Sequence, residues 1–274
     1  MPTISVIMAV YNTDDEDVLR TSIQSILNQT YQDFEFIICE DGSTDNTYSV
    51  LEKLCANDIR IKLLKNEKNI KAGGARNKCL SIAQGEFIAI MDADDYSHPA
   101  RLEKQIAFLR DNKEYDFVGC KGVYFKHKPS KIDGEYWFCK YPQKQDFLIT
   151  LPFVHGSLMF KKDSIEKQKG YCENNLVIRS EDYDLLLRLY AAGCRGANLE
   201  KSLYYIRQDD NTFKRRKYRF RVNEMIVKYR GFKNLGLMPK GIFYAIKPLV
   251  VGLIPVKILN KIKTIYYIKR RMRK

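Results

Sequence analysis

The stretch Glu86-Phe-Ile-Ala-Ile-Met-Asp-Ala-Asp-Asp95 decides the fold of this chain. Its first six residues are mostly apolar, which is typical of a strand buried on both faces of a parallel sheet. The run ends in Asp92, Asp94 and Asp95, three carboxylates within four residues. In open α/β sheets ligands bind at the carboxyl ends of the strands. Clustered carboxylates there favour a hard divalent cation with phosphate oxygens in its shell. The alternative is an ordinary turn in which the aspartates cap a helix.

Three further strand patterns precede this stretch, and each is followed by a helical pattern. Strands are expected at residues 4–10, 34–39 and 61–64, and helices at residues 18–27, 47–56 and 71–83. Four strand–helix repeats predict an α/β fold with an open, mostly parallel, doubly wound sheet. The later patterns predict a helix near 102–109, strands near 117–124 and 153–160, a loop over 126–146 and a helix at 183–192.

The composition limits the class of protein. The chain has 274 residues, of which 45% are hydrophobic and 29% charged, and these values exclude a disordered, collagen-like or multi-span membrane protein. Seven cysteines without a C-x-x-C pair predict reduced thiols in a cytosolic protein. Residues 1–11 have the pattern of a strand, so no secretory signal is expected there.

The net charge of +14 is concentrated at one end of the chain. Residues 213–274 contain 19 Lys and Arg against a single acid, Glu224, and carry +18, which leaves −4 for residues 1–212. We therefore expect two regions, a mildly acidic catalytic domain over 1–212 and a basic extension over 213–274.

The basic extension has the features of a membrane-surface anchor. Its longest uncharged stretch is nine residues, 248–256, which is too short to span a bilayer. One helical face is apolar and consists of Ile258, Leu259, Ile262, Ile265 and Tyr266. A basic amphipathic helix of this kind predicts attachment to an anionic membrane surface, and no nucleic acid is expected as partner. The alternative is a helical pair that packs on the catalytic domain.

Five motifs resemble those of family 2 glycosyltransferases in order and spacing. They are Ser5-Val-Ile-Met-Ala-Val-Tyr-Asn12, Glu40-Asp-Gly-Ser-Thr-Asp45, Ala75-Arg-Asn77, Gly85-Glu-Phe-Ile-Ala-Ile-Met-Asp-Ala-Asp-Asp95 and Ser180-Glu-Asp182. The resemblance covers roughly residues 2–210 and implies the GT-A fold, a Rossmann-like open sheet flanked by helices. It also implies an inverting, metal-dependent hexosyltransferase that uses a UDP-sugar.

The resemblance assigns the nucleoside end of the donor site. Asp41 is expected to accept a hydrogen bond from N3–H of the uracil ring, a role that suits an acceptor-only carboxylate. Ala9, Tyr11 and Asn12 are expected to form the floor and side of the base pocket. The alternative for Asp41 is a helix cap.

The diphosphate end of the donor site is assigned in the same way. Asp94 is expected to bind Mn²⁺ or Mg²⁺, Asp92 to face the ribose or sugar, and Asp95 to support the turn. Lys71 and Arg76, at the start of the third helix, are expected to reach the diphosphate or sugar, although exposed cations there are often only solvated.

The acceptor end centres on Asp182, the expected general base, with Glu181 beside it. Ser180 is expected to cap the following helix, whose N-terminus favours an ionised carboxylate. His155 is expected on the acceptor side. Relatives carry a His after a Tyr-Arg pair downstream, whereas Tyr205-Ile-Arg-Gln-Asp-Asp210 has none, and Asp209 is a candidate substitute ligand.

The sequence thus predicts transfer of a single sugar to a glycan or lipid-linked acceptor hydroxyl in cell-surface polysaccharide or glycolipid synthesis. The chain lacks the Q-x-x-R-W motif of processive synthases, since its only Trp is Trp137. We expect a cytoplasmic enzyme, peripheral on the inner face of the cell membrane. A sugar nucleotidyltransferase and a non-catalytic membrane or nucleic-acid binding module are the alternatives. The sugar, the acceptor, the linkage, the choice of metal and the oligomeric state stay open.

Overall fold

The computed structural model describes residues 1–208 and 217–254. In this part of the chain nine strands form one sheet, ordered β3-β2-β1-β4-β8-β6-β9-β5, with β7 paired to β6. The strands are β1 (Ile4–Val10), β2 (Phe34–Glu40), β3 (Ile61–Lys65), β4 (Phe87–Asp92), β5 (Tyr96–Ser97), β6 (Phe117–Phe125), β7 (Gly134–Glu135), β8 (Met159–Lys161) and β9 (Gly196–Arg207). The α helices are α1 (Glu16–Leu27), α2 (Thr47–Cys55), α3 (Lys71–Leu80), α4 (Arg101–Asp111), α5 (Lys162–Lys167), α6 (Glu181–Ala191), α7 (Tyr218–Asn234) and α8 (Gly241–Gly252).

The sheet confirms the predicted α/β fold. Strands β1, β2, β3 and β4 run parallel, and the chain moves outward from β1 to β3 before it returns to place β4 on the other side of β1. Strand order therefore reverses between β1 and β4, where ligands bind in such sheets. The register sets Ala9 opposite Cys39 of β2 and opposite Asp92 of β4.

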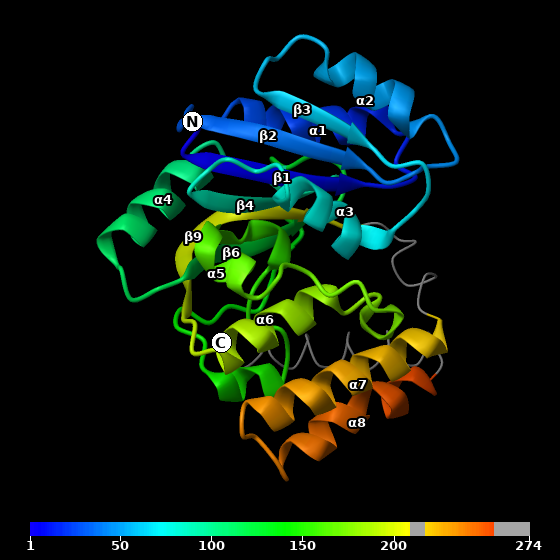
Figure 1. The fold of residues 1–274 in the computed structure, drawn as a ribbon, viewed down its shortest axis with the longest axis vertical. Helices are drawn as coiled ribbons and strands as arrows, with labels where there is room; N and C mark the ends of the chain where they lie inside the picture. Colours follow the sequence, from blue (N-terminus) through cyan, green and yellow to red (C-terminus); the bar gives the residue numbers. More distant parts are fainter. Residues whose placement is uncertain (209–216, 255–274) are drawn as a thin grey trace.

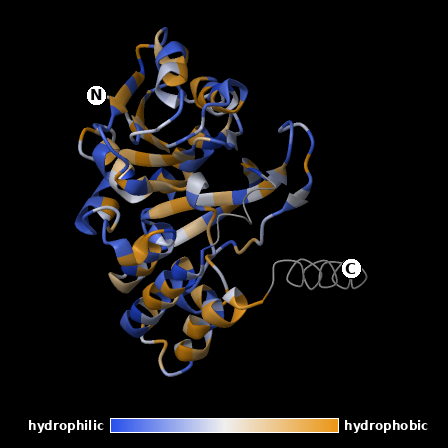
Figure 2. Cartoon of the chain, turned by 90° about the vertical axis from the view of Figure 1, so that its right-hand side faces the viewer, coloured by the Kyte–Doolittle hydropathy of each residue, from blue (hydrophilic) through white to orange (hydrophobic). Residues whose placement is uncertain are grey.

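Successive side chains of the central strands pack alternately into two hydrophobic cores, one on each face of the sheet. In β1, Ile7 joins the core that includes α3 and α6, whereas Val6 and Met8 join the core that includes α1 and α4. A strand buried on both faces needs apolar residues at successive positions, not at alternate ones. This explains the continuous apolar runs of the sequence, and the central strands are mostly coloured hydrophobic in Figure 2.

Two sequence predictions need correction in the middle of the chain. Residues 153–160 do not form one strand: a 3₁₀ turn covers His155–Ser157 and only β8 follows. The buried guanidinium of Arg101 donates to the carbonyl oxygens of Gly156 and Ile90, at 2.9 and 3.0 Å, and ties this turn to β4. The predicted loop over 126–146 contains β7 and the beginning of a 3₁₀ helix at Lys144–Leu148.

Helix α7 packs on α6, and α8 packs along α7, below the sheet in Figure 1. Val227, Phe232 and Ala245 belong to the same core as α3 and α6. For residues 218–252 the structure thus shows the helical-pair alternative, whereas the predicted apolar face over 258–266 and the boundary at 212 lie outside the described residues. No helix in the described part is long and apolar enough to cross a membrane.

Because α7 shares this core, its buried side chains should matter for stability. Phe232 is fully buried, so Phe232→Ala is expected to lower the free energy of unfolding by about 3–5 kcal/mol in a urea titration. Tyr229→Ala, on the same helix but 47% exposed, serves as the control and should change it by no more than about 0.5 kcal/mol. Equal, small effects of both changes would show that α7 is only loosely attached.

Candidate active site

An ion pair occupies the end of β4. Arg76 of α3 is buried, and its Nη2 lies 2.8 Å from Oδ1 of Asp92. Burial by itself lowers the pKa of the guanidinium, but Asp92 together with Tyr171 and Glu181 outweighs this effect, and the pKa is raised. Arg76 is therefore part of the site and not a solvated surface cation.

The other two aspartates of the acidic turn have different surroundings. Asp95 is buried, and its Oδ1 accepts from the backbone N–H of Arg207 at 2.8 Å, so it supports the turn. The side chain of Asp94 is exposed, and its carbonyl oxygen accepts from Nε of Arg207 at 2.8 Å.

The donor set at this turn limits how a metal could bind. Within residues 1–208 and 217–254, no three His, Cys, Asp or Glu side chains are grouped so as to hold one. A closed protein cage is thus not present there. One exposed carboxylate, Asp94, fits Mg²⁺ or Mn²⁺ that takes its other ligands from water and from the phosphate oxygens of a substrate. The predicted substitute ligand Asp209 lies outside the described residues.

The end of β2 forms a second polar cluster. Asp41 is buried and accepts from Asn66 Nδ2 at 2.8 Å and from the Ile70 N–H at 2.9 Å. Burial raises the pKa of this carboxyl group, and the two hydrogen bonds oppose it. Asp41 does not cap α2, which begins at Thr47 with Asn46 as its N-cap. It does accept from the backbone of Ile70 and Lys71, at the start of α3, so the helix-cap alternative holds for that helix. A carboxylate can accept about four hydrogen bonds, so Asp41 keeps capacity for a ligand.

The remaining predicted donor residues surround this cluster. Asn12 has φ +46° and accepts from the Thr44 N–H at 3.0 Å, which ties the end of β1 to the turn after β2. Gly42 of that turn has φ +63°, and a Cβ there would lie 2.5 Å from the Lys68 backbone. Tyr11 is 45% exposed. Lys71 is exposed, and its Nζ donates to Asn69 Oδ1 at 2.6 Å.

The start of α6 carries the predicted catalytic carboxylates. Burial and then the like charge of Glu181 raise the pKa of Asp182 to about 6, although the Tyr183 N–H donates to its Oδ1 at 2.7 Å. The sequence expectation was that the helix N-terminus favours the ionised form of this group. Desolvation outweighs the helix end and raises the pKa, but a group with a pKa of about 6 is still mostly ionised at pH 7. Ser180 stands at the N-cap position, but its hydroxyl makes no capping hydrogen bond.

His155 lies close to the ion pair of Arg76 and Asp92, whose charges act on its ring. It is buried, and its Nε2 is 2.9 Å from the hydroxyl of Tyr171. Burial and then the charge of Arg76 lower the pKa of the ring to about 3. A neutral imidazole at working pH holds Tyr171 in place and does not shuttle protons.

Three residues of the site carry no local sequence signal. Gly156 has no side chain, and a Cβ there would lie 2.6 Å from Asp92 Oδ2 and closer still to the Tyr204 hydroxyl. The hydroxyl of Tyr204 accepts from the Asp92 N–H at 3.1 Å. Tyr171 faces His155 and Arg76. Each is brought to Asp92 by long-range packing, which no spacing in the sequence encodes.

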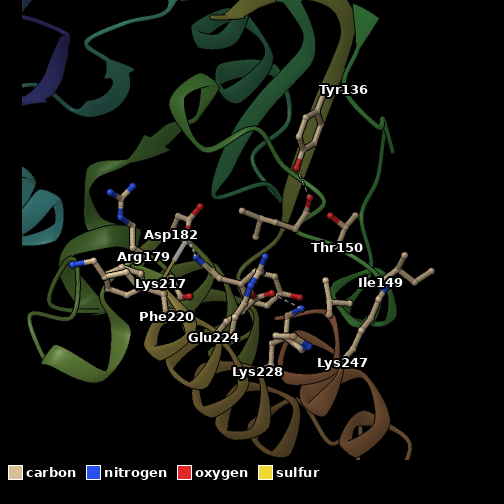
Figure 3. Close-up of a pocket in the computed structure, with 16 residues that line it drawn as sticks. Tyr136, Ile149, Thr150, Arg179, Asp182, Lys217, Phe220, Glu224, Lys228 and Lys247 are labelled. Carbon is tan, nitrogen blue, oxygen red and sulfur yellow. Dashed lines mark hydrogen bonds and ion pairs between the residues drawn. The ribbon is translucent and has the colours of Figure 1, made fainter. Parts of the chain in front are cut away.

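A pocket of about 730 Å³ opens beside Asp182, between α6, α7 and α8. Figure 3 shows Asp182 towards one side of this pocket and Lys247 and Ile149 towards the other. The pocket extends from the candidate base to the two C-terminal helices.

Comparison with known proteins decides the family. The model of glycosyl transferase family 2 matches residues 5–168, and that of glycosyl transferase family group 2 matches residues 87–268. This chain is a family 2 glycosyltransferase. EpsE of Bacillus subtilis (strain 168), a glycosyltransferase by name, is 37% identical over 272 residues, with 99% of this chain and 95% of that protein covered. The O-antigen biosynthesis glycosyltransferase WbnJ of Escherichia coli is 39% identical over 193 residues, covering 68% and 71%.

A solved structure shows the same fold. Residues 1–349 of S. aureus TarS in complex with UDP-GlcNAc match with a TM-score of 0.68 at 20% identity, over 91% of this chain and 71% of that one. The fold is thus GT-A, and the protein is a transferase. The two alternatives from the sequence, a nucleotidyltransferase and a binding module, do not agree with this family.

Proposed function

We propose that this glycosyltransferase moves one sugar from a UDP-sugar to a hydroxyl of a glycan or lipid-linked acceptor, with inversion, and that Asp182 is the general base. One observation carries the proposal. Asp182 lines the pocket, and the charges of Arg76 and Asp92 at the end of β4 act on its pKa. A carboxylate with a pKa near 6 is mostly ionised at pH 7 and is a stronger base than an ordinary aspartate.

Relatives support the donor and the acceptor class. The E. coli protein WfaP, 29% identical over 249 residues, is named as a UDP-Glc:α-D-GlcNAc-diphosphoundecaprenol β-1,3-glucosyltransferase. TarS was solved with UDP and with UDP-GlcNAc. Cell-surface polysaccharide synthesis is the setting that we infer for this chain.

In the proposed reaction the acceptor oxygen attacks the anomeric carbon while Asp182 takes the hydroxyl proton. The bond from that carbon to the diphosphate oxygen breaks, and UDP leaves with the bonding electrons. Glu181 raises the basicity of Asp182 through its like charge. Asp92, whose Oδ1 is fixed by Arg76, orients the ribose or the sugar, and Asp41 accepts from the uracil N3–H. Ala9, Tyr11 and Asn12 enclose the base, and His155 shapes the acceptor side through Tyr171.

The metal is assigned to Asp94, with Lys71 near the diphosphate. Asp94 would hold a divalent cation, which would supply positive charge at the departing diphosphate. Mn²⁺ and Mg²⁺ both bind oxygen ligands, and a single carboxylate does not discriminate between them.

Replacement of the base tests the proposal. Asp182→Asn is expected to lower transfer from a UDP-sugar by about 10²–10⁴-fold, the range for a lost general base, with UDP affinity nearly unchanged. Asp184→Asn is the control, because Asp184 on the same helix pairs with Arg188 at 2.7 Å. If UDP affinity collapses while turnover survives, Asp182 binds donor and is not the base.

The pH profile gives a second, independent test. Since the base acts only when ionised and its pKa is about 6, kcat/KM is expected to fall as the pH drops through 6. Glu181→Gln removes a like charge, which lowers the pKa of Asp182 and moves this acid limb to lower pH. An unmoved acid limb in Glu181→Gln would assign the limb to another group.

Asp94→Asn tests the metal assignment. The change keeps the shape and removes the charge that holds a cation, so UDP binding should lose its response to Mn²⁺ and transfer should be almost abolished. In the presence of a chelator, wild type and variant should bind UDP equally. A Mn²⁺ response that survives in the variant contradicts the assignment of Asp94.

We also propose peripheral attachment to the inner face of the cell membrane, with the boundary of the basic region at residue 213. A stripe on α8 supports it: Phe243, Ile246, Val250 and Leu253 are 78%, 45%, 57% and 73% exposed. Their spacing of three and four residues puts them on one helical face. Figure 2 shows α8, the helix before the grey C-terminal trace, coloured mainly as hydrophobic.

Vesicle sedimentation tests this attachment without disturbing the core. Phe243→Ser is expected to lower partition onto vesicles containing anionic lipid by about tenfold or more, the cost of one exposed aromatic side chain. Ile59→Ser is the control, because Ile59 is fully exposed and lies before β3. Added salt should weaken the binding of the wild type. Equal partition of both variants contradicts the proposed contact surface.

A further inference from the structure

The pocket beside Asp182 is strongly basic. Its lining includes two carboxylates, Asp182 and Glu224. Against them stand five cations, Arg179, Lys217, Arg221, Lys228 and Lys247. The concave surface next to the candidate base therefore carries an excess of three positive charges.

Glu224 compensates only two of these cations. Its Oε2 lies 3.0 Å from Arg221 Nη1, and its Oε1 lies 3.0 Å from Lys228 Nζ. For Arg179, Lys217 and Lys247, no carboxylate of residues 1–208 or 217–254 lies within ion-pair distance of 4.0 Å. These three like charges, gathered around one cavity, raise the local potential and favour an anion of matching charge.

The number of cations distinguishes between kinds of anion. One carboxylate would leave two of the three charges uncompensated, whereas a diphosphate brings two or three negative charges in one small group. Lys and Arg both bind phosphate oxygens through charge-assisted hydrogen bonds. A diphosphate is thus the better match to this pocket.

We propose that the acceptor of the transfer carries a phosphate or diphosphate group, which binds between Arg179, Lys217 and Lys247 while the acceptor's sugar reaches Asp182. This inference rests on the proposed function, because it names the chemical class of the acceptor. It assigns acceptor recognition to α7 and α8, outside the sheet that holds the donor residues.

The pocket also has an apolar part, which is relevant to whether the phosphate belongs to a lipid or to a soluble sugar. Pro248 and Val251 of α8 line the pocket together with Ile149. Lys247 stands four residues after Phe243 of the exposed α8 stripe, so the two side chains lie on the same side of the helix. A lipid-linked diphosphate at a membrane surface and a soluble sugar diphosphate share the chemistry that the cations recognise, and the experiment separates them.

Calorimetric titration of inorganic pyrophosphate into the full-length protein tests the site. A chelator is present, which suppresses metal-dependent binding at the donor site. The Lys217→Ala/Lys247→Ala variant should bind pyrophosphate at least about tenfold more weakly, since it loses two charge-assisted contacts to the phosphate oxygens. Lys233→Ala/Lys240→Ala removes the same charge from exposed positions on and next to these helices and should stay within about twofold of wild type.

Two results would overturn the proposal. The first is a wild type that shows no measurable binding of pyrophosphate. The second is equal weakening of binding in both double variants, which would indicate only the general charge of the region. UDP titration with Mn²⁺ on the same samples reports on the donor site. Failure of UDP binding would contradict the proposed function and leave the pyrophosphate result valid.

Geranyl diphosphate and geraniol identify the source of the phosphate. Tighter binding of geranyl diphosphate than of pyrophosphate supports a lipid-linked acceptor, and equal binding supports a soluble one. If geraniol binds as tightly as geranyl diphosphate, the phosphate is not recognised and the proposal is wrong.

Discussion

The ion pair between Arg76 and Asp92 joins α3 to β4 where the strand order reverses, and the rest of the site is arranged around it. A guanidinium can be buried there only because a carboxylate faces it, since removal of one partner leaves an uncompensated charge. The pair fixes Oδ1 of Asp92, and the absence of a side chain at Gly156 leaves room for Oδ2. Its charges also act on the pKa values of His155 and Asp182. One contact thus links the donor end of the site to the acceptor end.

The sequence predicted those parts of the fold that local patterns encode. Strands β1, β2 and β4 are mostly apolar because both faces are covered, and the turns after them carry the polar residues that the GT-A fold needs at its carboxyl edge. The run over 153–160 misled for the same reason: it is apolar and buried, but Arg101, more than fifty residues earlier, ties Gly156 into a turn. Periodicity does not report contacts across that distance.

The positions of the candidate residues in the fold were predicted better than their burial, their ion pairs and their pKa values. Asp182 and Glu181 do lie at the N-terminus of α6, yet the helix end was expected to keep the base ionised, whereas burial and the neighbouring carboxylate dominate its pKa. Likewise, the net charge of +18 of residues 213–274 does not say which of the cations are paired with carboxylates. In the described part, Lys228 is buried against Glu224 while Lys247 and Lys217 stay unpaired at the pocket. Burial and pairing arise only when distant helices meet, so composition could not have supplied them.

The position of Asp182 between two charged regions imposes a condition on any anionic acceptor. The base works only when ionised, and a phosphate bound nearby would raise its pKa further by like-charge repulsion. Cations that surround the phosphate cancel most of this effect, because a neutralised ion pair has a weaker field at a distance than a bare anion. The excess of positive charge in the pocket would therefore serve two purposes at once. It would attract the acceptor. It would also prevent the negative charge of the acceptor from raising the pKa of Asp182, so that the base stays ionised.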